Sequence, residues 1–183
     1  QITLRVLSVF KLNGKVALIT GSTRGIGKAI AVAMADAGAD VVISSRNIDD
    51  CDDVASEINA RESSEQGRAI AISCNISHRD QLENLVNETR EKFGKIVVLV
   101  FNAAVNPHLG SLSTISDKAL DKILSTNIKS NHWLCQLVLP EMVERRDGSI
   151  TIISSIAAFV GQLELGAYGI SKAADLALIR NLA

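Results

Sequence analysis

The chain has 183 residues, of which 47% are hydrophobic and 21% are charged, and its formal net charge is -1. This size and composition are typical of one globular domain with a substantial core. Lysine and arginine are scattered, so the sequence lacks the basic stripe expected of a nucleic-acid-binding or membrane-surface protein. No apolar run approaches the roughly 20 residues that cross a bilayer. We therefore expect a soluble protein whose partner is a small neutral or anionic molecule, with no nucleic acid and no membrane.

The three cysteines, Cys51, Cys74 and Cys135, are far apart and odd in number, which predicts reduced structural thiols instead of a disulfide framework. The histidines are equally dispersed, so no metal site is expected. We expect a cytoplasmic location, with mitochondrial and peroxisomal locations as alternatives. Residues 1–11 lack Met and acidic residues, which faintly resembles the end of an organelle-targeting segment. We interpret residues 1–11 as a lead-in to the first strand and residues 12–183 as the domain.

Short apolar runs alternate with longer amphipathic segments along the chain. The runs are nearly continuously apolar, as strands buried on both faces must be. Glycines at 38 and 94 are natural helix ends, and Pro140 predicts a bend because it lacks an amide hydrogen. In chain order we predict strand 16–20, helix 26–37, strand 41–45, helix 49–62, strand 69–73, helix 79–93, strand 96–101, helix 117–146, strand 149–154 and a last helix from Gly166. This alternation predicts an α/β fold, a doubly wound parallel sheet with helices on both faces.

The sequence T-G-S-T-R-G-I-G, residues 20–27, joins the first predicted strand to the first helix. Gly21, Gly25 and Gly27 let the backbone turn sharply and approach a pyrophosphate, whose charge the helix amides favour. A purely structural tight turn is the alternative. The position after the first strand of a βαβ unit favours a nucleotide.

Further motifs follow in order: F-N-A-A at residues 101–104, Asn127 within S-T-N-I-K, and Ser155 followed by Tyr168 and Lys172 in Y-x-x-x-K. With the G-x-x-x-G-x-G spacing of the glycine loop, this set resembles the short-chain dehydrogenase/reductase family over nearly the whole chain from Leu12. The resemblance implies a Rossmann fold and hydride transfer to or from a nicotinamide cofactor.

The cofactor expected is NADP(H), with NAD(H) less favoured. Residues 44–47, S-S-R-N, offer no carboxylate for a ribose 2'-hydroxyl, whereas Arg46 and Arg24 can meet a 2'-phosphate. Asn75 stands where the family usually has an Asp that reaches the adenine, and can still accept and donate hydrogen bonds. By resemblance, the remaining cofactor-binding residues are Thr23, Ile26, Ser45, Asn102, Ala103 and Ala104, together with the three loop glycines and with Tyr168 and Lys172.

Tyr168 is the expected proton donor, and Lys172 four residues later lies on the same helical face. A nearby cation favours the phenolate, so we expect Lys172 to lower the pKa of Tyr168. By resemblance, Lys172 also binds the nicotinamide ribose, and Asn127 holds a water that links Lys172 to solvent. Ser155 is expected to bond the substrate oxygen, with Ser154 as its competitor. Taken singly, each of these residues has a purely structural alternative. Tyr168 and Lys172 could be a surface pair, Ser155 could cap a strand end, and Asn127 could bond its own backbone.

The runs at residues 102–107 and 148–159 look most like the NADP-dependent carbonyl and retinal reductase branch. The segment 156–166 is mainly apolar, which suits an uncharged ketone or aldehyde. Family members usually continue well past the Tyr168 helix, so a chain that ends at Ala183 is expected to be C-terminally incomplete, and poorly stable and nearly inactive alone.

Two other functions stay open. A 3-oxoacyl carrier-protein reductase would need a basic docking surface, for which Arg145 and Arg146 are a slight hint. A non-catalytic dinucleotide-binding fragment would be expected to lack Tyr, Lys or Ser at the site, and all three are present. The resemblance also implies a homodimer or homotetramer in the intact protein, packed through helix 117–146 and the Tyr168 helix.

Overall fold

The computed structural model describes residues 11–61 and 66–183. Most of the predicted lead-in and the last residue of the helix predicted over 49–62 therefore lie outside the described residues. The strands are β1 (Val16–Thr20), β2 (Asp40–Ser44), β3 (Ala69–Ala71), β4 (Ile96–Phe101) and β5 (Ser149–Ile152). The helices are α2 (Gly25–Asp36), α3 (Ile48–Asn59), α4 (Arg79–Phe93), α5 (Asp117–Leu124), α6 (Ser130–Arg145) and α7 (Gly166–Leu182), with short turns η1 (Leu112–Thr114), η2 (Ser125–Lys129) and η3 (Ile156–Ala158).

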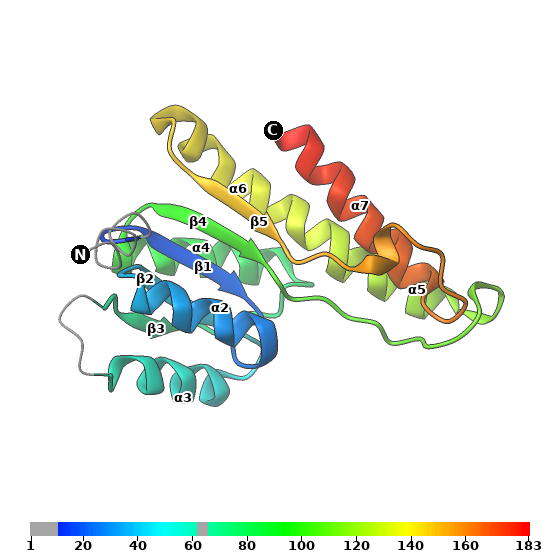
Figure 1. Ribbon diagram of the computed structural model, residues 1–183, viewed down its shortest axis with the longest axis horizontal. Coiled ribbons are helices and arrows are strands. Elements are labelled where there is room, and N and C mark those ends of the chain that lie inside the picture. The colour runs from blue at the N-terminus through cyan, green and yellow to red at the C-terminus, as the bar shows by residue number, and fades with distance from the viewer. Residues whose placement is uncertain (1–10, 62–65) are drawn as a thin grey trace, which may run out of the picture.

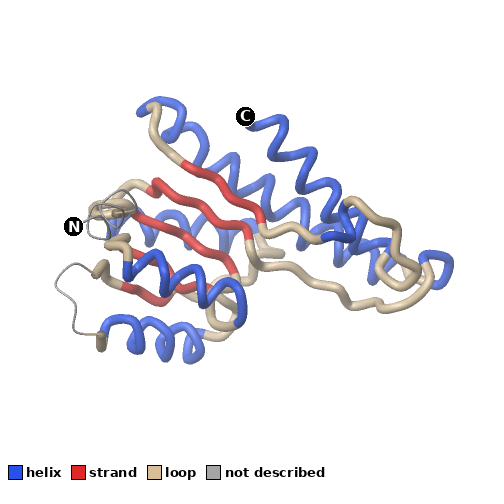
Figure 2. Tube along the Cα trace, in the orientation of Figure 1, coloured by secondary structure: helices blue, strands red, loops and turns tan. Residues whose placement is uncertain are grey.

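The five strands form one parallel sheet in the order β3-β2-β1-β4-β5 (Figures 1 and 2). The predicted α/β class and doubly wound topology are confirmed. The strands β1, β2 and β3 follow one another toward one edge of the sheet, and β4 and β5 follow one another toward the other edge. The order of addition therefore reverses between β1 and β4, and ligands of open α/β sheets bind at the carboxyl ends of the strands at such a switch point. The topology thus places the candidate site beyond Thr20 and Phe101.

Alternate residues of each central strand pack on opposite faces of the sheet. Ala17 and Ile19 of β1 belong to a buried cluster with α2 and α3, whereas Leu18 belongs to a cluster with α4 and α6. Figure 1 shows α2 and α4 on opposite sides of the strands. Because side chains alternate along a strand, both faces of the sheet need apolar residues. This explains the nearly unbroken apolar runs in the sequence.

The single long helix predicted over 117–146 is wrong in detail. The segment forms α5, one turn of π-helix at η2 and then α6, which runs through Pro140 without interruption. A π turn shifts the backbone hydrogen bonds, and side chains donate to carbonyl oxygens of the turn. The Ser130 hydroxyl donates to Thr126 O (2.5 Å), and the Asn131 amide donates to Asn127 O (2.8 Å). The irregularity is therefore centred on Asn127, a predicted site residue.

Three strands end earlier than predicted, at Ser44, Ala71 and Ile152, while the bounds of β1, β4 and α4 match the prediction. After β5, Ile153 still donates its amide hydrogen to Phe101 O (2.8 Å). The chain then leaves the sheet, and the Ser155 hydroxyl caps η3 by accepting from Ala157 N (3.2 Å). Within the described part of the chain, no helix has both the length and the apolar character to span a membrane.

We predict that Leu18→Ala lowers the free energy of unfolding by about 2–5 kcal/mol, because Leu18 is fully buried in the middle of the sheet and its loss leaves a cavity. Urea unfolding measures this change. Leu163→Ala is the matched control, since that side chain is 85% exposed, and it should change the free energy by less than about 0.5 kcal/mol. Equal effects of the two substitutions would contradict the packing described above.

Candidate nucleotide-binding and catalytic site

The glycine loop turns between β1 and α2 with backbone angles that favour glycine. Gly21 has φ +66° and Gly25 has φ +57°. Gly27 has an ordinary helical conformation, but a Cβ atom there would lie 2.4 Å from Gly21 O and 2.4 Å from the side-chain nitrogen of Asn102. The third glycine therefore allows the first turn of α2 to sit directly on the loop, with its free amides at the carboxyl end of β1.

Side chains tie this loop to the end of β4. The Thr20 hydroxyl oxygen accepts from the backbone N–H groups of Asn102 and Ala103, both at 3.1 Å. The Asn102 side-chain amide donates to Thr20 O (3.0 Å) and to Gly21 O (2.9 Å). Asn102, predicted to bind the cofactor, thus has both amide hydrogens committed to the loop. In this structure its side chain holds the loop, and its backbone lines the groove.

Sequence reasoning missed Thr20 and Ser22 as part of this scaffold. The Ser22 hydroxyl donates to Ile19 O (2.8 Å) and accepts from Ser44 N (2.8 Å), which joins the ends of β1 and β2. Both side chains are buried. A hydroxyl at the end of an apolar strand is the only signal in the sequence, and it does not identify the partner strand.

A cavity of about 630 Å³ lies along these strand ends. This volume is within the range of small-molecule sites. Predicted residues that line it are Gly21, Thr23, Arg24, Ser45, Arg46, Asn75, Asn102, Ala103 and Ala104. Lining residues that were not predicted are Asn47, Asp50, Cys74, Ile76, Ser77, Val105, Lys122 and Thr126. Gly25, Ile26 and Gly27 form the start of α2 and are not among the lining residues, and the Ile26 side chain is 61% exposed.

Two guanidinium groups border the part of the cavity at the end of β2. Arg24 and Arg46 are both exposed, and neither has an ion-pair partner among the described residues. One carboxylate, that of Asp50 in the first turn of α3, shares this lining. Two unpaired cations and one carboxylate give the part of the cavity at the end of β2 a net positive charge, which suits a phosphate.

Asn75 lies at the other wall of the same cavity. Its side-chain oxygen accepts from Ser77 N (3.2 Å), and its backbone N–H donates to the Gln81 side chain (2.7 Å). The side-chain amide nitrogen has no such bond among the described contacts, so it is the part of Asn75 that can donate to a ligand.

The three cysteines are free and buried. Burial raises the pKa of Cys74 to about 12 and that of Cys135 to about 11. The prediction of structural thiols is confirmed for these residues.

Tyr168 and Lys172 lie on α7, with the Lys172 nitrogen 5.8 Å from the centre of the Tyr168 ring. The pKa of Tyr168 is raised by burial and by the charge of Asp175, against a lowering hydrogen bond with Ser155. The sequence predicted that Lys172 would lower the pKa of Tyr168, and this prediction is wrong, because the pKa is raised overall. The reason is geometric: the Lys172 ammonium donates to Ile153 O (2.7 Å) and pairs with Asp175 (3.2 Å).

The two neighbouring serines have different partners. The Ser155 hydroxyl lies close enough to the Tyr168 phenol to lower its pKa, whereas the Ser154 hydroxyl donates to the backbone oxygen of Lys172 (3.3 Å). Of the two serines, Ser155 is therefore the one whose hydroxyl shares a location with the phenol.

Asn127 joins the cavity to α7. Its side-chain oxygen accepts from Val105 N (2.8 Å), and its amide donates to Val105 O and to the Ser171 hydroxyl, both at 3.0 Å. Asn127 is 1% exposed. Because Val105 lines the cavity and Ser171 precedes Lys172, this side chain fixes the helix of Tyr168 and Lys172 against the cavity wall.

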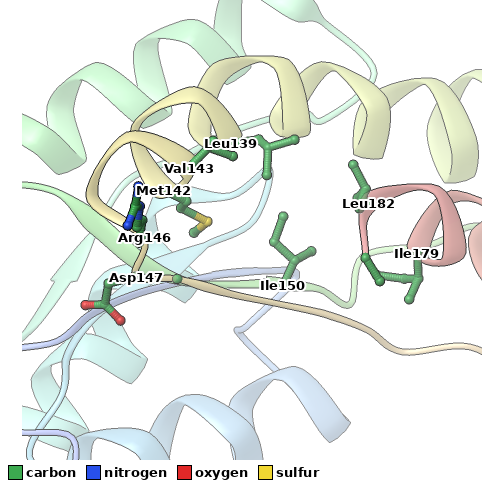
Figure 3. Close-up of a pocket in the computed structure, with 10 residues that line it drawn as sticks. Leu139, Met142, Val143, Arg146, Asp147, Ile150, Ile179 and Leu182 are labelled. Carbon is green, nitrogen blue, oxygen red and sulfur yellow. The ribbon is translucent and has the colours of Figure 1, made fainter.

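A second hollow of about 310 Å³ lies between the ends of α6 and α7 and above β5 (Figure 3). Its lining is mainly aliphatic, from Leu139, Met142, Val143, Ile150, Ile179 and Leu182. None of the predicted site residues lines it. Most of the predicted nucleotide-binding residues thus line the larger cavity, whereas Asn127, Ser155, Tyr168 and Lys172 line neither hollow.

We predict that Gly27→Ala weakens NADPH binding at least about tenfold, because the new methyl group would displace the Gly21 carbonyl and open the loop. Fluorescence titration of NADPH measures the dissociation constant. Gly161→Ala is the control, since a Cβ at Gly161 meets nothing within 4 Å. Unchanged affinity in Gly27→Ala would show that the loop does not bind the nucleotide in this way.

Comparison with known proteins agrees with this geometry. The family model for short chain dehydrogenase matches residues 15–183. The chain is 41% identical over 172 residues to dehydrogenase/reductase SDR family member 4 of Bos taurus, covering 94% of this chain and 60% of that protein. It is 37% identical over 174 residues to tropinone reductase-like 3 of Erythroxylum coca, covering 94% of this chain and 65% of that protein. The chain thus spans about 60% of the length of the curated relatives it matches most strongly.

Solved structures give the same result. A metagenomic short-chain oxidoreductase in complex with NADP has a TM-score of 0.87 at 32% identity, over 94% of this chain and 76% of that one. A 3-oxoacyl (acyl-carrier-protein) reductase from Agrobacterium tumefaciens with NADP bound has a TM-score of 0.89 at 31% identity, over 99% of this chain and 68% of that one. From the glycine loop, the Rossmann sheet and these matches together, the chain belongs to the short-chain dehydrogenase/reductase family.

Proposed function

We propose that the protein is an NADP(H)-dependent oxidoreductase that transfers a hydride between the cofactor and a ketone or aldehyde, or the corresponding alcohol. The observation that carries this proposal is the grouping of three side chains: Ser155 lies near enough to the Tyr168 phenol to lower its pKa, and the buried Lys172 ammonium lies 5.8 Å from the centre of the Tyr168 ring. Asn127 connects this group to the wall of the cavity that begins at the glycine loop.

The residues present fit a dinucleotide. The α2 amides and the Cβ-free cradle at Gly27 suit the pyrophosphate, and the unpaired Arg24 and Arg46 suit a 2'-phosphate. Lys172 would hold the nicotinamide ribose, as the family resemblance implies. When bound, NADPH supplies the hydride. The two similar structures that contain NADP support this choice of cofactor.

In the proposed reaction, negative charge develops on the substrate carbonyl oxygen, and donors aimed at that oxygen lower the barrier. Ser155 donates a hydrogen bond there, and the Tyr168 hydroxyl transfers its proton to the same oxygen. The raised pKa of Tyr168 keeps the phenol protonated at neutral pH, which suits carbonyl reduction. Alcohol oxidation needs the phenolate and should therefore quicken as the pH rises.

An apolar carbonyl compound suits the surface next to this group. After Ser155 the chain exposes large apolar side chains, namely Ile156 (65%), Phe159 (74%), Val160 (53%) and Leu163 (85%). A substrate with hydrophobic flanks can cover them. The homodimer or homotetramer implied by the family, and residues 12–183 as one dinucleotide-binding domain, remain predictions.

A 3-oxoacyl carrier-protein reductase is the second candidate, favoured by the similarity to the Agrobacterium enzyme. The sequence offered Arg145 and Arg146 as a basic docking surface for the acidic carrier, and the structure supports this less well. The Arg145 guanidinium donates to Asp147 O (2.7 Å) and lies 3.8 Å from Glu141, so it is engaged within the protein. Assaying acyl thioesters beside simple ketones and aldehydes separates the two candidates.

We predict that Tyr168→Phe lowers kcat for carbonyl reduction at least about 100-fold, because it removes the hydroxyl that donates the proton and keeps the ring. The dissociation constant of NADPH should change less than about threefold. Steady-state assays and fluorescence titration measure the two quantities. Turnover at the unsubstituted rate would refute the role of Tyr168, and nucleotide binding without any turnover in the unsubstituted protein would favour a non-catalytic binding protein.

We predict that Arg46→Asp weakens NADPH binding about tenfold or more and improves NADH binding, because a carboxylate repels the 2'-phosphate and can bond a ribose hydroxyl. The ratio of the two dissociation constants is the measurement. Arg146→Asp makes the same charge change at an exposed arginine outside the nucleotide cavity and should leave the ratio unchanged. If both variants keep the original ratio, Arg46 does not select the cofactor.

A further inference from the structure

A buried polar network lies behind Lys172 that the proposed chemistry does not use. Asp175 is 1% exposed and Asn131 is 3% exposed. Asp175 is three residues after Lys172 on α7, and Asn131 is in the first turn of α6. A carboxylate is rarely so fully buried, and it stays charged only when it is paired and hydrogen-bonded.

The contacts form a continuous chain from the π turn to the ammonium. One Asp175 oxygen pairs with the Lys172 nitrogen at 3.2 Å, and the other accepts from the Asn131 amide at 2.9 Å. The same amide nitrogen donates to Asn127 O at 2.8 Å. Asn131 therefore joins the irregular backbone of η2 to the carboxylate that holds Lys172.

We propose that Asp175 is a positioning residue for the Lys172 ammonium, and that Asn131 holds Asp175 in place. This inference rests on the proposed oxidoreductase function. An ammonium has three N–H donors, and among the described contacts Ile153 O and Asp175 take two. Held from two directions, Lys172 keeps its nitrogen beside the Tyr168 ring and its remaining donor for the ribose.

Packing alone does not require such a network. Replacing a buried ion pair by apolar residues of similar volume is often neutral or stabilising. Asp175 also acts on the phenol, since its charge raises the pKa of Tyr168. Burial raises the pKa of Asp175 itself, against the opposing effects of Lys172 and Asn131.

The groups that face Asp175 are few. From α7 these are Lys172 and Tyr168, from α6 the neutral Asn131 amide, and from the end of β5 the Ile153 carbonyl that shares Lys172. Removing the carboxylate charge therefore leaves the Lys172 cation as the one charge beside the phenol within residues 11–61 and 66–183, and this cation favours the phenolate. Asp175→Asn should lower the pKa of Tyr168.

Tyr168 is the one tyrosine in the 183-residue sequence, so its ionisation can be observed directly. The experiment is a near-ultraviolet titration of phenolate absorbance in the 183-residue chain, with Tyr168→Phe subtracted as the blank. In Asp175→Asn we expect the phenol to titrate about 0.5–1 pH unit lower. The pH dependence of alcohol oxidation should shift by the same amount. Carbonyl reduction at neutral pH should slow about tenfold, because Lys172 is no longer held by the Asp175 carboxylate.

Asp121→Asn is the matched control, because Asp121 is an exposed aspartate on α5, and it should leave the titration and the rates unchanged. Asn131→Ala should slow reduction by a smaller factor, since Asp175 then loses one of its two partners. If Asp175→Asn does not fold, as judged by circular dichroism, Asp175→Ser removes the same charge with a smaller side chain and serves for the same titration.

A phenol that titrates at its original pH or higher in a folded variant overturns the proposal, because a merely structural Asp175 would change the amount of folded protein and not the position of the titration. Failure of the underlying function has a different signature. In that case Tyr168→Phe would keep its turnover, whereas the titration of Asp175→Asn would still report on the electrostatic contact.

Discussion

The site depends on one close approach, that of the first turn of α2 to the carboxyl ends of β1 and β4. Gly27 permits it because any Cβ would meet Gly21 O at 2.4 Å. Thr20 and Asn102 then join the loop to the end of β4 through four hydrogen bonds between 2.9 and 3.1 Å. The parallel sheet alone would leave a crevice between these strands. The side-chain contacts fix its width and turn the α2 amides into the crevice.

A second constraint connects the helix of Tyr168 and Lys172 to the wall of the same crevice. The π turn at η2 places Asn127 where it bonds Val105 on one side and Ser171 on the other. A regular helix through this segment would present a different face to α7, because each turn rotates the side chains by a fixed angle. The irregular turn therefore links the nucleotide cavity to the helix that carries Tyr168 and Lys172.

The sequence predicted the fold well, since a strand buried on both faces must be apolar along its length, as β1 and β4 are. It predicted the family's site residues because their spacing is unusual. It did not predict which side chains serve the scaffold: the Asn102 amide bonds the backbone of the glycine loop, and the Asn127 amide bonds Val105 O and the Ser171 hydroxyl. Nor did it single out Asp175, because an Asp three residues after a Lys normally suggests an exposed helical pair. Its burial depends on Asn131, which is 44 residues earlier in the chain.

The electrostatics of the phenol depend on this same burial. Lys172 was expected to favour the phenolate, but a cation paired with a carboxylate has little net charge to offer. Burial and the Asp175 charge together raise the pKa of Tyr168, and the Ser155 hydrogen bond opposes them. A phenol that keeps its proton at neutral pH is ready to donate it, as the proposed carbonyl reduction requires. Lys172 then contributes mainly through where its ammonium is held, between the end of β5 and the carboxylate of α7. The position of that cation, and not its presence alone, is what the surrounding amides and carboxylate determine.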